Sequence, residues 1–191
     1  MYGRNVWVMQ CTEELKHEHQ AVLKALAILE KVGRALEEGQ TGTLDDAGRV
    51  MEFLTVFVDR CHHGKEENIL FPALVQAGVP GEGGPVGVML TEHDEGRRYI
   101  RDMKDALTAL TGGRREKAAS FVAAARNYAE LLREHIEKED NVLYPLADHL
   151  LPLGTDEEMA REFQRIENEK VGAGKHEEFH RMLHELDELY R

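Results

Sequence analysis

Histidines and glutamates recur in this sequence at spacings that suit metal binding. The chain contains ten histidines, and among them His62 and His135 each precede a glutamate by four residues, at Glu66 and Glu139. Residues four apart in an α-helix project to the same side, about one turn apart, so an imidazole and a carboxylate can hold one cation together. The spacing therefore predicts two helical His-x-x-x-Glu metal-binding pairs.

The two pairs lie within an internal repeat. Residues 66–72 (EENILFP) match residues 139–145 (EDNVLYP) at an offset of 139 − 66 = 73, and the histidines of the two pairs obey the same offset. His19 and His93, one expected helix earlier in each half, are separated by 93 − 19 = 74. Each half therefore offers one histidine and one His-x-x-x-Glu pair, and we expect an approximate twofold axis between the halves.

The repeat predicts a carboxylate-bridged site for two metal ions, with coordination positions left open for a small ligand. Without a metal, each of these inward polar groups would need a partner or cost about 1–3 kcal/mol. Nitrogen and oxygen ligands suit iron, or less favourably manganese or zinc, and such iron pairs are typical of helical bundles. Two iron ions are therefore predicted, with the ligands His19, His62, Glu66, His93, His135 and Glu139.

Neighbouring residues offer an alternative ligand register. His63 and Glu67 also stand four apart, but they lie about 100° around the helix from the apolar stripe. The repeat aligns Ile136 with His63, so we interpret His63 and Glu67 as flanking groups and keep His63 as an alternative ligand. Asp140 is rotated around the helix away from His135. Glu139 projects in the same direction as His135 and matches Glu66 in the repeat, so Glu139 is preferred over Asp140 as the ligand.

A third group of histidines stands near the end of the chain. His176 and His180 border an apolar stripe that includes Phe179 and Leu183. One interpretation is a solvated amphipathic helix. The alternative is that this helix lays His176 or His180 across the mouth of the metal site as a further ligand.

Helices must position these residues, because apolar side chains recur at helical spacing and no stretch shows sustained strand-like alternation. We predict an all-α protein in which residues 1–150 form an up-down-up-down four-helix bundle and residues 151–191 add two helices packed on it. The bundle helices are expected at about residues 13–39, 44–78, 85–111 and 114–145, and the last two at about 156–172 and 175–190.

Local signals refine the helix ends. Thr43 with Asp46, and Thr155 with Glu158, have the spacing of capping boxes at helix starts. Pro72 is expected to kink or interrupt the second helix near its end, because proline cannot donate a backbone hydrogen bond.

Composition restricts the classes of function. The length of 191 residues suits one domain with an appendage, and the net charge of −12 argues against binding nucleic acid or an anionic membrane surface. Cys11 and Cys61 form no disulfide or zinc motif, which favours a reducing, cytoplasmic setting. The apolar run within the segment Met1–Gln10 is too short for the core of a signal peptide or for a membrane span.

Two strings, residues 61–72 (CHHGKEENILFP) and residues 135–145 (HIEKEDNVLYP), carry a resemblance to a known family. With them, the region from about residue 14 to 145 resembles hemerythrin-like proteins, specifically the bacterial HHE cation-binding type. The resemblance implies a four-helix bundle with a non-heme di-iron site. It also implies that the six residues named above are the iron ligands and that the glutamates can bridge the irons.

The sequence departs from the oxygen-carrying hemerythrins of invertebrates, whose third helix bears two histidines four apart. Here the positions four residues on either side of His93 are Met89 and Arg97. One imidazole fewer leaves a further coordination position open. This difference favours sensing, or chemistry at bound peroxide or nitric oxide, over simple oxygen transport.

Three classes of function fit the sequence. The first is a non-enzymatic di-iron protein that binds dioxygen, nitric oxide, peroxide or iron in sensing, storage or stress response. The second is a di-iron enzyme that decomposes peroxide, or a protein that donates iron to repair damaged metal centres. The third is a zinc-binding or purely structural bundle. The sequence favours the first class and leaves enzymatic activity open.

Overall fold

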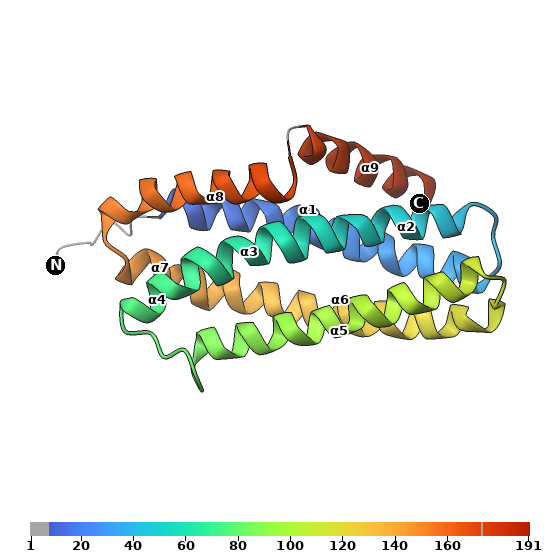
Figure 1. The fold of residues 1–191 in the computed structure, drawn as a ribbon, viewed down its shortest axis with the longest axis horizontal. Coiled ribbons are helices and arrows are strands. Elements are labelled where there is room, and N and C mark those ends of the chain that lie inside the picture. Colours follow the sequence, from blue (N-terminus) through green and yellow to red (C-terminus); the bar gives the residue numbers. More distant parts are fainter. Residues whose placement is uncertain (1–7, 173) are drawn as a thin grey trace.

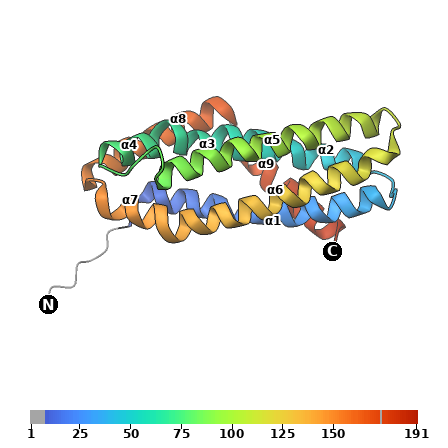
Figure 2. The same ribbon diagram turned by 90° about the horizontal axis from the view of Figure 1, so that it is seen from below.

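A computed structural model of the chain describes residues 8–172 and 174–191. Within those ranges the protein is helical and contains no strand, and four long antiparallel rods form a bundle (Figures 1 and 2). The rods are α1 (Gln10–Glu37); α2 (Thr43–Phe53) with α3 (His63–Lys65) and α4 (Phe71–Gln76); α5 (Pro85–Thr111); and α6 (Ala118–Lys138) with α7 (Tyr144–Leu150). The predicted all-α up-down-up-down bundle is confirmed. Most of the segment Met1–Gln10 lies outside the described residues.

Wider π-helical turns connect the pieces of the second and fourth rods. They span Leu54–His62 and Glu66–Leu70 in the second rod, and Glu139–Leu143 in the fourth. The last two of these segments end just before Pro72 and Pro145. A proline cannot donate to the preceding turn and its ring crowds the carbonyl four residues earlier, so a widened turn lets the helix continue. The expected kink or interruption at Pro72 therefore takes the form of a widened turn just before it, and the rod stays helical through the proline.

The two predicted capping boxes are also absent. The α2 helix begins after Gly42, whose φ of 84° is the left-handed conformation that glycine adopts easily. The Thr43 hydroxyl donates to the carbonyl oxygen of Gln40 at 2.7 Å, and the Thr155 hydroxyl donates to that of Pro152 at 2.7 Å. Both hydroxyls therefore close the preceding turn instead of capping the helix that follows.

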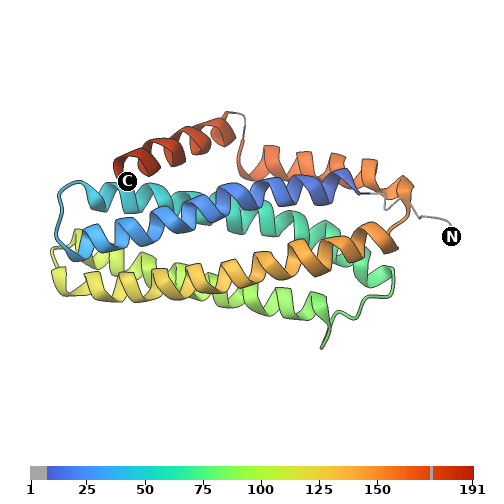
Figure 3. The same ribbon diagram turned by 180° about the vertical axis from the view of Figure 1, so that it is seen from behind.

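The last two helices, α8 (Asp156–Lys170) and α9 (Lys175–Leu189), lie along α1 on the outside of the bundle (Figures 1 and 3). They are part of the apolar interior, because Phe163 of α8 and Leu186 of α9 are both 0% exposed. The Asp156 carboxylate accepts hydrogen bonds from the backbone nitrogens of Gln10 and Cys11 at 2.8 and 3.1 Å. The start of α8 thereby fixes the start of α1.

The core consists of two apolar clusters with a polar layer between them. On α1 one cluster includes Leu15 and the other includes Val22, with His19 between the two. On α5, Met89 and Met103 belong to different clusters. Each rod thus carries its polar residues into the same buried layer, which apolar side chains close off at both ends.

Two further sequence expectations can be compared with the structure. Cys11 and Cys61 are both buried and free. In the part of the chain that the structure describes, no helix combines the length and apolar character needed to cross a bilayer.

Candidate metal centre

The polar layer brings together all six residues predicted from the repeat. Each of them is at most 2% exposed, so their polar atoms face one another and not solvent. His19 comes from α1 and His93 from α5. The second rod supplies His62 and Glu66, and the fourth rod supplies His135 and Glu139.

The four imidazoles form two pairs, one in each half of the repeat. The Nε2 atoms of His19 and His62 are 3.1 Å apart, and the Nε2 atoms of His93 and His135 are also 3.1 Å apart. Equal distances in the two halves agree with the expected twofold relationship. Each pair presents two nitrogen atoms to one point in the layer.

Glu139 spans the two halves. Its Oε1 lies 3.3 Å from Nε2 of His135, in its own half. Its Oε2 lies 3.3 Å from Nε2 of His19, in the other half. With one oxygen beside each imidazole pair, Glu139 has the arrangement of a carboxylate that bridges two cations.

Glu66 occupies the corresponding position from the second rod. Its Oε2 lies 3.9 Å from Nε2 of His62 and 3.4 Å from Nε2 of His93, while its Oε1 accepts a hydrogen bond of 2.6 Å from the Tyr144 hydroxyl. The glutamate therefore lies nearer the imidazole of the opposite half. The potential ligands therefore group across the two halves. Glu66 lies with His93 and His135, and Glu139 lies with His19 and His62, so neither His-x-x-x-Glu pair forms a cluster by itself.

A second set of carboxylates contacts the other nitrogen of each of these four imidazoles. A carboxylate oxygen stands 2.7–2.9 Å from each Nδ1 atom. The pairs are Asp140 with His19, Glu18 with His62, Glu67 with His93, and Glu92 with His135. Such contacts fix the ring orientation and favour a proton on Nδ1, which leaves Nε2 free for a metal.

Sequence reasoning identified only part of this supporting set. Glu67, which the repeat places as a flanking group, lies with its carboxylate 2.7 Å from Nδ1 of His93. Glu18 and Glu92 received no role, although their separation of 92 − 18 = 74 equals that of the histidines that follow them. Asp140 was considered only as a rejected ligand. The repeat offset could have identified all of them, because supporting residues obey it as the ligands do.

The electrostatics of the metal-free layer favour protonated imidazoles. Burial alone would lower the pKa of His19, but the carboxylates of Asp140 and Glu139 raise it to about 9. Burial would also lower the pKa of His135, but the Glu139 carboxylate raises it to about 10. Burial would raise the pKa of Glu139, whereas His135 and His19 hold it well below its usual range. A cation entering the layer must displace these protons.

A buried lysine stabilises Glu18, the carboxylate that contacts Nδ1 of His62. Lys65 is 0% exposed, and its ammonium group donates to Glu14 at 2.6 Å and to Glu18 at 2.5 Å. Glu167 of α8 lies 3.5 Å away. Burial would raise the pKa of Glu18, but His62 and Lys65 lower it to about 2. The three glutamates therefore surround an ammonium group and form no additional cation site.

Buried polar atoms that lack a hydrogen-bond partner show whether a metal fits the layer. Glu66 Oε2 and both carboxylate oxygens of Glu139 are buried and have no hydrogen-bond partner in the part of the chain that the structure describes. Buried charge left without a partner is costly, whereas divalent cations between the carboxylates and the imidazoles would satisfy it. Imidazole nitrogen with carboxylate oxygen is a donor set that suits iron. The residues therefore fit a pair of divalent cations.

His63 lies deeper than the sequence suggested. It is 3% exposed, and its ring stacks on that of His93 with 3.8 Å between centroids. Burial, followed by the neighbouring His93, holds the pKa of His63 well below its usual range. One of its ring nitrogens lies within 4.8 Å of ligand atoms of Glu66, His93 and His135. The wider π-helical turn around His62 brings its neighbour inward.

The C-terminal histidines lie elsewhere. The Nε2 atoms of His176 and His180 are 3.0 Å apart, and Nδ1 of His176 lies 3.0 Å from Glu167. His176 also packs edge-on against Phe57. Neither residue belongs to the two buried clusters, so the structure places them in a separate pair on α9, where His176 contacts α8 and the second rod.

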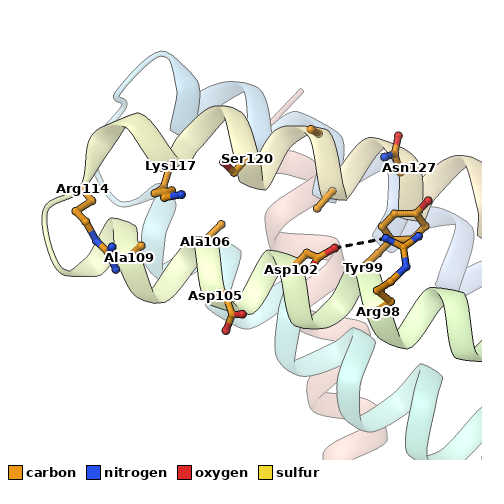
Figure 4. Close-up of a pocket in the computed structure, with 12 residues that line it drawn as sticks. Arg98, Tyr99, Asp102, Asp105, Ala106, Ala109, Arg114, Lys117, Ser120 and Asn127 are labelled. Atoms are coloured by element: carbon orange, nitrogen blue, oxygen red, sulfur yellow. Dashed lines mark ion pairs between the residues drawn. The ribbon is translucent and has the colours of Figure 1, made fainter.

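A surface cavity of about 550 Å³ lies between α5 and α6 (Figure 4). Arg98 and Asp102, 3.8 Å apart, form an ion pair at one end of it, and Lys117 and Arg114 line the other end. Its lining includes none of the clustered histidines, and it mixes acidic with basic groups. The cavity therefore adds nothing to the metal chemistry.

Comparisons with known proteins agree with this geometry. The sequence model of the family described as Hemerythrin HHE cation binding domain matches residues 11–147. The iron-sulfur cluster repair protein YtfE of Edwardsiella ictaluri is 32% identical over 136 residues, which are 68% of this chain and 59% of that protein. YtfE of Escherichia coli O1:K1 is 37% identical over 89 residues, 45% of this chain and 40% of that protein. The chain therefore matches less than two thirds of the length of either relative.

Proposed function

The chain belongs to the hemerythrin HHE cation-binding domain family, and from this premise we propose that its polar layer holds two iron ions that bind dioxygen, nitric oxide or peroxide in a stress response. The observation that carries the proposal is the position of Glu139, whose two oxygens lie 3.3 Å from imidazole nitrogens of opposite halves. A carboxylate placed in this way, with no other partner for either oxygen, supports two cations and not one.

The protein supplies position, shielding and a hydrogen-bond donor. Bound iron would supply open coordination positions and redox chemistry for a small ligand. The apolar clusters on both sides of the layer exclude water, and the burial of every proposed ligand restricts entry to molecules of a few atoms. The Tyr144 hydroxyl, 2.6 Å from Glu66 and 3.4 Å from Nε2 of His19, is the polar group placed beside the layer from α7.

Metal analysis of protein purified without added metal tests the proposal. We expect about two irons per chain, since the layer has two clusters, and a spectroscopic change when nitric oxide is added to the anaerobically reduced protein. Glu139→Gln should bind less iron, because it removes the charge that faces both clusters. Predominant zinc, or iron content unaffected by this substitution, would argue instead for the zinc-binding or structural alternative.

A second candidate function is iron donation in the repair of damaged iron–sulfur clusters. The observation that favours it is the name of the relatives, both of which are described as iron-sulfur cluster repair proteins. The burial of the layer opposes rapid exchange, so donation would require the rods to separate. Incubating the iron-loaded chain with a ferredoxin whose cluster was damaged by nitric oxide tests this function. Recovery of the cluster absorbance that exceeds recovery with an equal amount of free iron supports donation.

A further inference from the structure

His63 is a buried imidazole without a partner. Among residues 8–172 and 174–191, neither of its ring nitrogens has a hydrogen-bond partner, and the nearest carboxylate oxygen, on Asp59, is 3.9 Å from Nδ1. The Asp59 carboxylate is instead engaged by Arg97 at 2.7 Å. A buried polar side chain with two unsatisfied nitrogens is costly, so this position calls for a ligand that the protein atoms alone do not provide.

The nearest groups to His63 are those of one cluster. Its ring is stacked on His93 at an interplanar angle of 15°, and its centroid is 5.8 Å from that of His135. One nitrogen of His63 forms a group with Glu66, His93 and His135, in which all the ligand atoms lie within 4.8 Å of one another. The other buried cluster contains only His19, His62 and Glu139. The two clusters therefore differ by one imidazole.

The repeat shows that the difference is built into the sequence. The residue that corresponds to His63 at the offset of 73 is Ile136, which has no metal-binding atom. Tyr144 corresponds to Phe71 at the same offset. Tyr144 packs beside His19, with 5.5 Å between ring centroids, whereas Phe71 packs beside His93 at 5.8 Å. One cluster therefore has an added imidazole with the apolar Phe71 beside it, whereas the ring of Tyr144 lies beside the other cluster and its hydroxyl lies between the two, 2.6 Å from Glu66 and 3.4 Å from Nε2 of His19.

We propose that His63 is a third imidazole ligand of the iron held by Glu66, His93 and His135, so that an external ligand binds at the other iron, beside Tyr144. The inference rests on the proposed di-iron function and specifies which of its two positions is reactive. It also changes the comparison with the oxygen-carrying hemerythrins. The imidazole absent from the third helix, where Met89 and Arg97 flank His93, is replaced from the second rod.

Azide binding to the oxidised, iron-loaded chain tests the asymmetry, because azide gives an intense absorption band on ferric iron. We expect the wild type to bind about one azide per chain and His63→Ile to bind about two, since removing an imidazole opens a coordination position. Ile136, the residue that corresponds to His63 in the fourth rod, lies in a regular α-helix and belongs to the apolar core. Ile136→Val is therefore the matched control, and it should leave both azide stoichiometry and iron content unchanged.

X-ray absorption gives a readout that does not depend on added ligand. Five imidazoles shared by two irons give an average of about 2.5 per iron, and four in His63→Gln give about 2. Circular dichroism of the metal-free variants checks that each one folds, and His63→Gln replaces His63→Ile if the latter does not.

The possible results separate the two proposals. A wild type that does not hold two irons refutes the proposed function and this inference with it. Two irons per chain, with azide stoichiometry and imidazole number unchanged by the loss of His63, refute this inference alone. Two irons with the expected changes support both proposals.

Discussion

At the scale of single residues, the two ring nitrogens of each of the four paired histidines, His19, His62, His93 and His135, have different surroundings. A carboxylate holds each Nδ1 atom at 2.7–2.9 Å, and the Nε2 atoms converge in pairs. The supporting carboxylates decide which nitrogen carries the proton, and so they prepare the rings for a metal before it arrives. Adjacent acids in the sequence therefore have different tasks, as Glu139 and Asp140 illustrate.

Substitution of these two acids should have unequal effects. Glu139→Gln removes the carboxylate that faces both clusters, and we expect loss of most bound iron. Asp140→Asn removes only the charge beside Nδ1 of His19, and it should weaken metal affinity by about 10–100-fold. Iron content after dialysis against a graded chelator measures both effects, and the exposed Glu137→Gln serves as control. Equal losses in the two variants would contradict the division of roles.

Tyr144→Phe should separate stability from metal content. The variant has the residue that the repeat already places at Phe71, so its shape fits, but Glu66 loses a hydrogen-bond donor at 2.6 Å. A hydrogen bond to a charged, buried group contributes about 1.5–3 kcal/mol. We expect the metal-free variant to lose about that much unfolding free energy in urea, with iron content retained. An unchanged urea midpoint would show that the hydroxyl does not stabilise Glu66.

At the scale of elements, α8 acts as part of the core that holds the site. Phe163 is 0% exposed, and the ammonium group of Lys65 lies 5.6 Å from the centre of its ring. Lys65 in turn contacts Glu18, which holds His62. Packing of α8 is thereby coupled to the orientation of a proposed ligand on another rod.

Phe163→Ala should therefore strongly reduce the stability of the protein, although Phe163 lies outside the first 150 residues. Removing a fully buried phenylalanine costs about 3–5 kcal/mol, and the loosened α8 should also lower metal affinity. Thermal unfolding and iron content measure the two effects. Arg165→Ala, on the exposed face of the same helix, is the control and should change stability by no more than about 0.5 kcal/mol. A small effect of Phe163→Ala would indicate that α8 is a dispensable appendage.

Periodicity predicted the rods well and their local geometry poorly. The four-residue spacing placed His19, His62, Glu66, His93, His135 and Glu139 in one layer, because regular helices carry an apolar stripe faithfully over many turns. The depth of His63 could not be predicted in this way, since azimuths calculated for regular α-helix fail where the turn widens to a π-helix.

Helix ends were harder to predict for a different reason. The Thr43 hydroxyl has a choice between two backbone groups of similar strength, an amide ahead of it and a carbonyl behind it. The spacing between Thr43 and Asp46 in the sequence does not determine which group the hydroxyl contacts, and in the structure it donates to the preceding carbonyl.

At the scale of the whole molecule, the bundle must fold around a layer of like-charged carboxylates before or while metal binds. In the metal-free chain, protonated imidazoles take the place of the cations, because the folded pKa values of His19 and His135, about 9 and about 10, exceed the ordinary value of 6.5. Groups with a raised folded pKa stabilise the fold below the unfolded pKa and lose that contribution as pH rises through the folded pKa. Metal-free stability should therefore decline between about pH 6.5 and 10.

Metal binding should show the opposite dependence and release protons. The raised pKa values of His19 and His135 favour protonated rings at pH 7, and although burial would lower the pKa of His93, Glu66 and Glu67 raise it as well. Each ring must be neutral to bind a cation, so anaerobic ferrous loading at pH 7 should release about two protons per chain from His19 and His135, with a further contribution from His93. The release should fall as the pH rises through the folded pKa values. Calorimetric titration in two buffers of different ionisation enthalpy measures the number. A release near zero at pH 7 would mean that the imidazoles are already neutral, and that some other group balances the carboxylates of the empty layer.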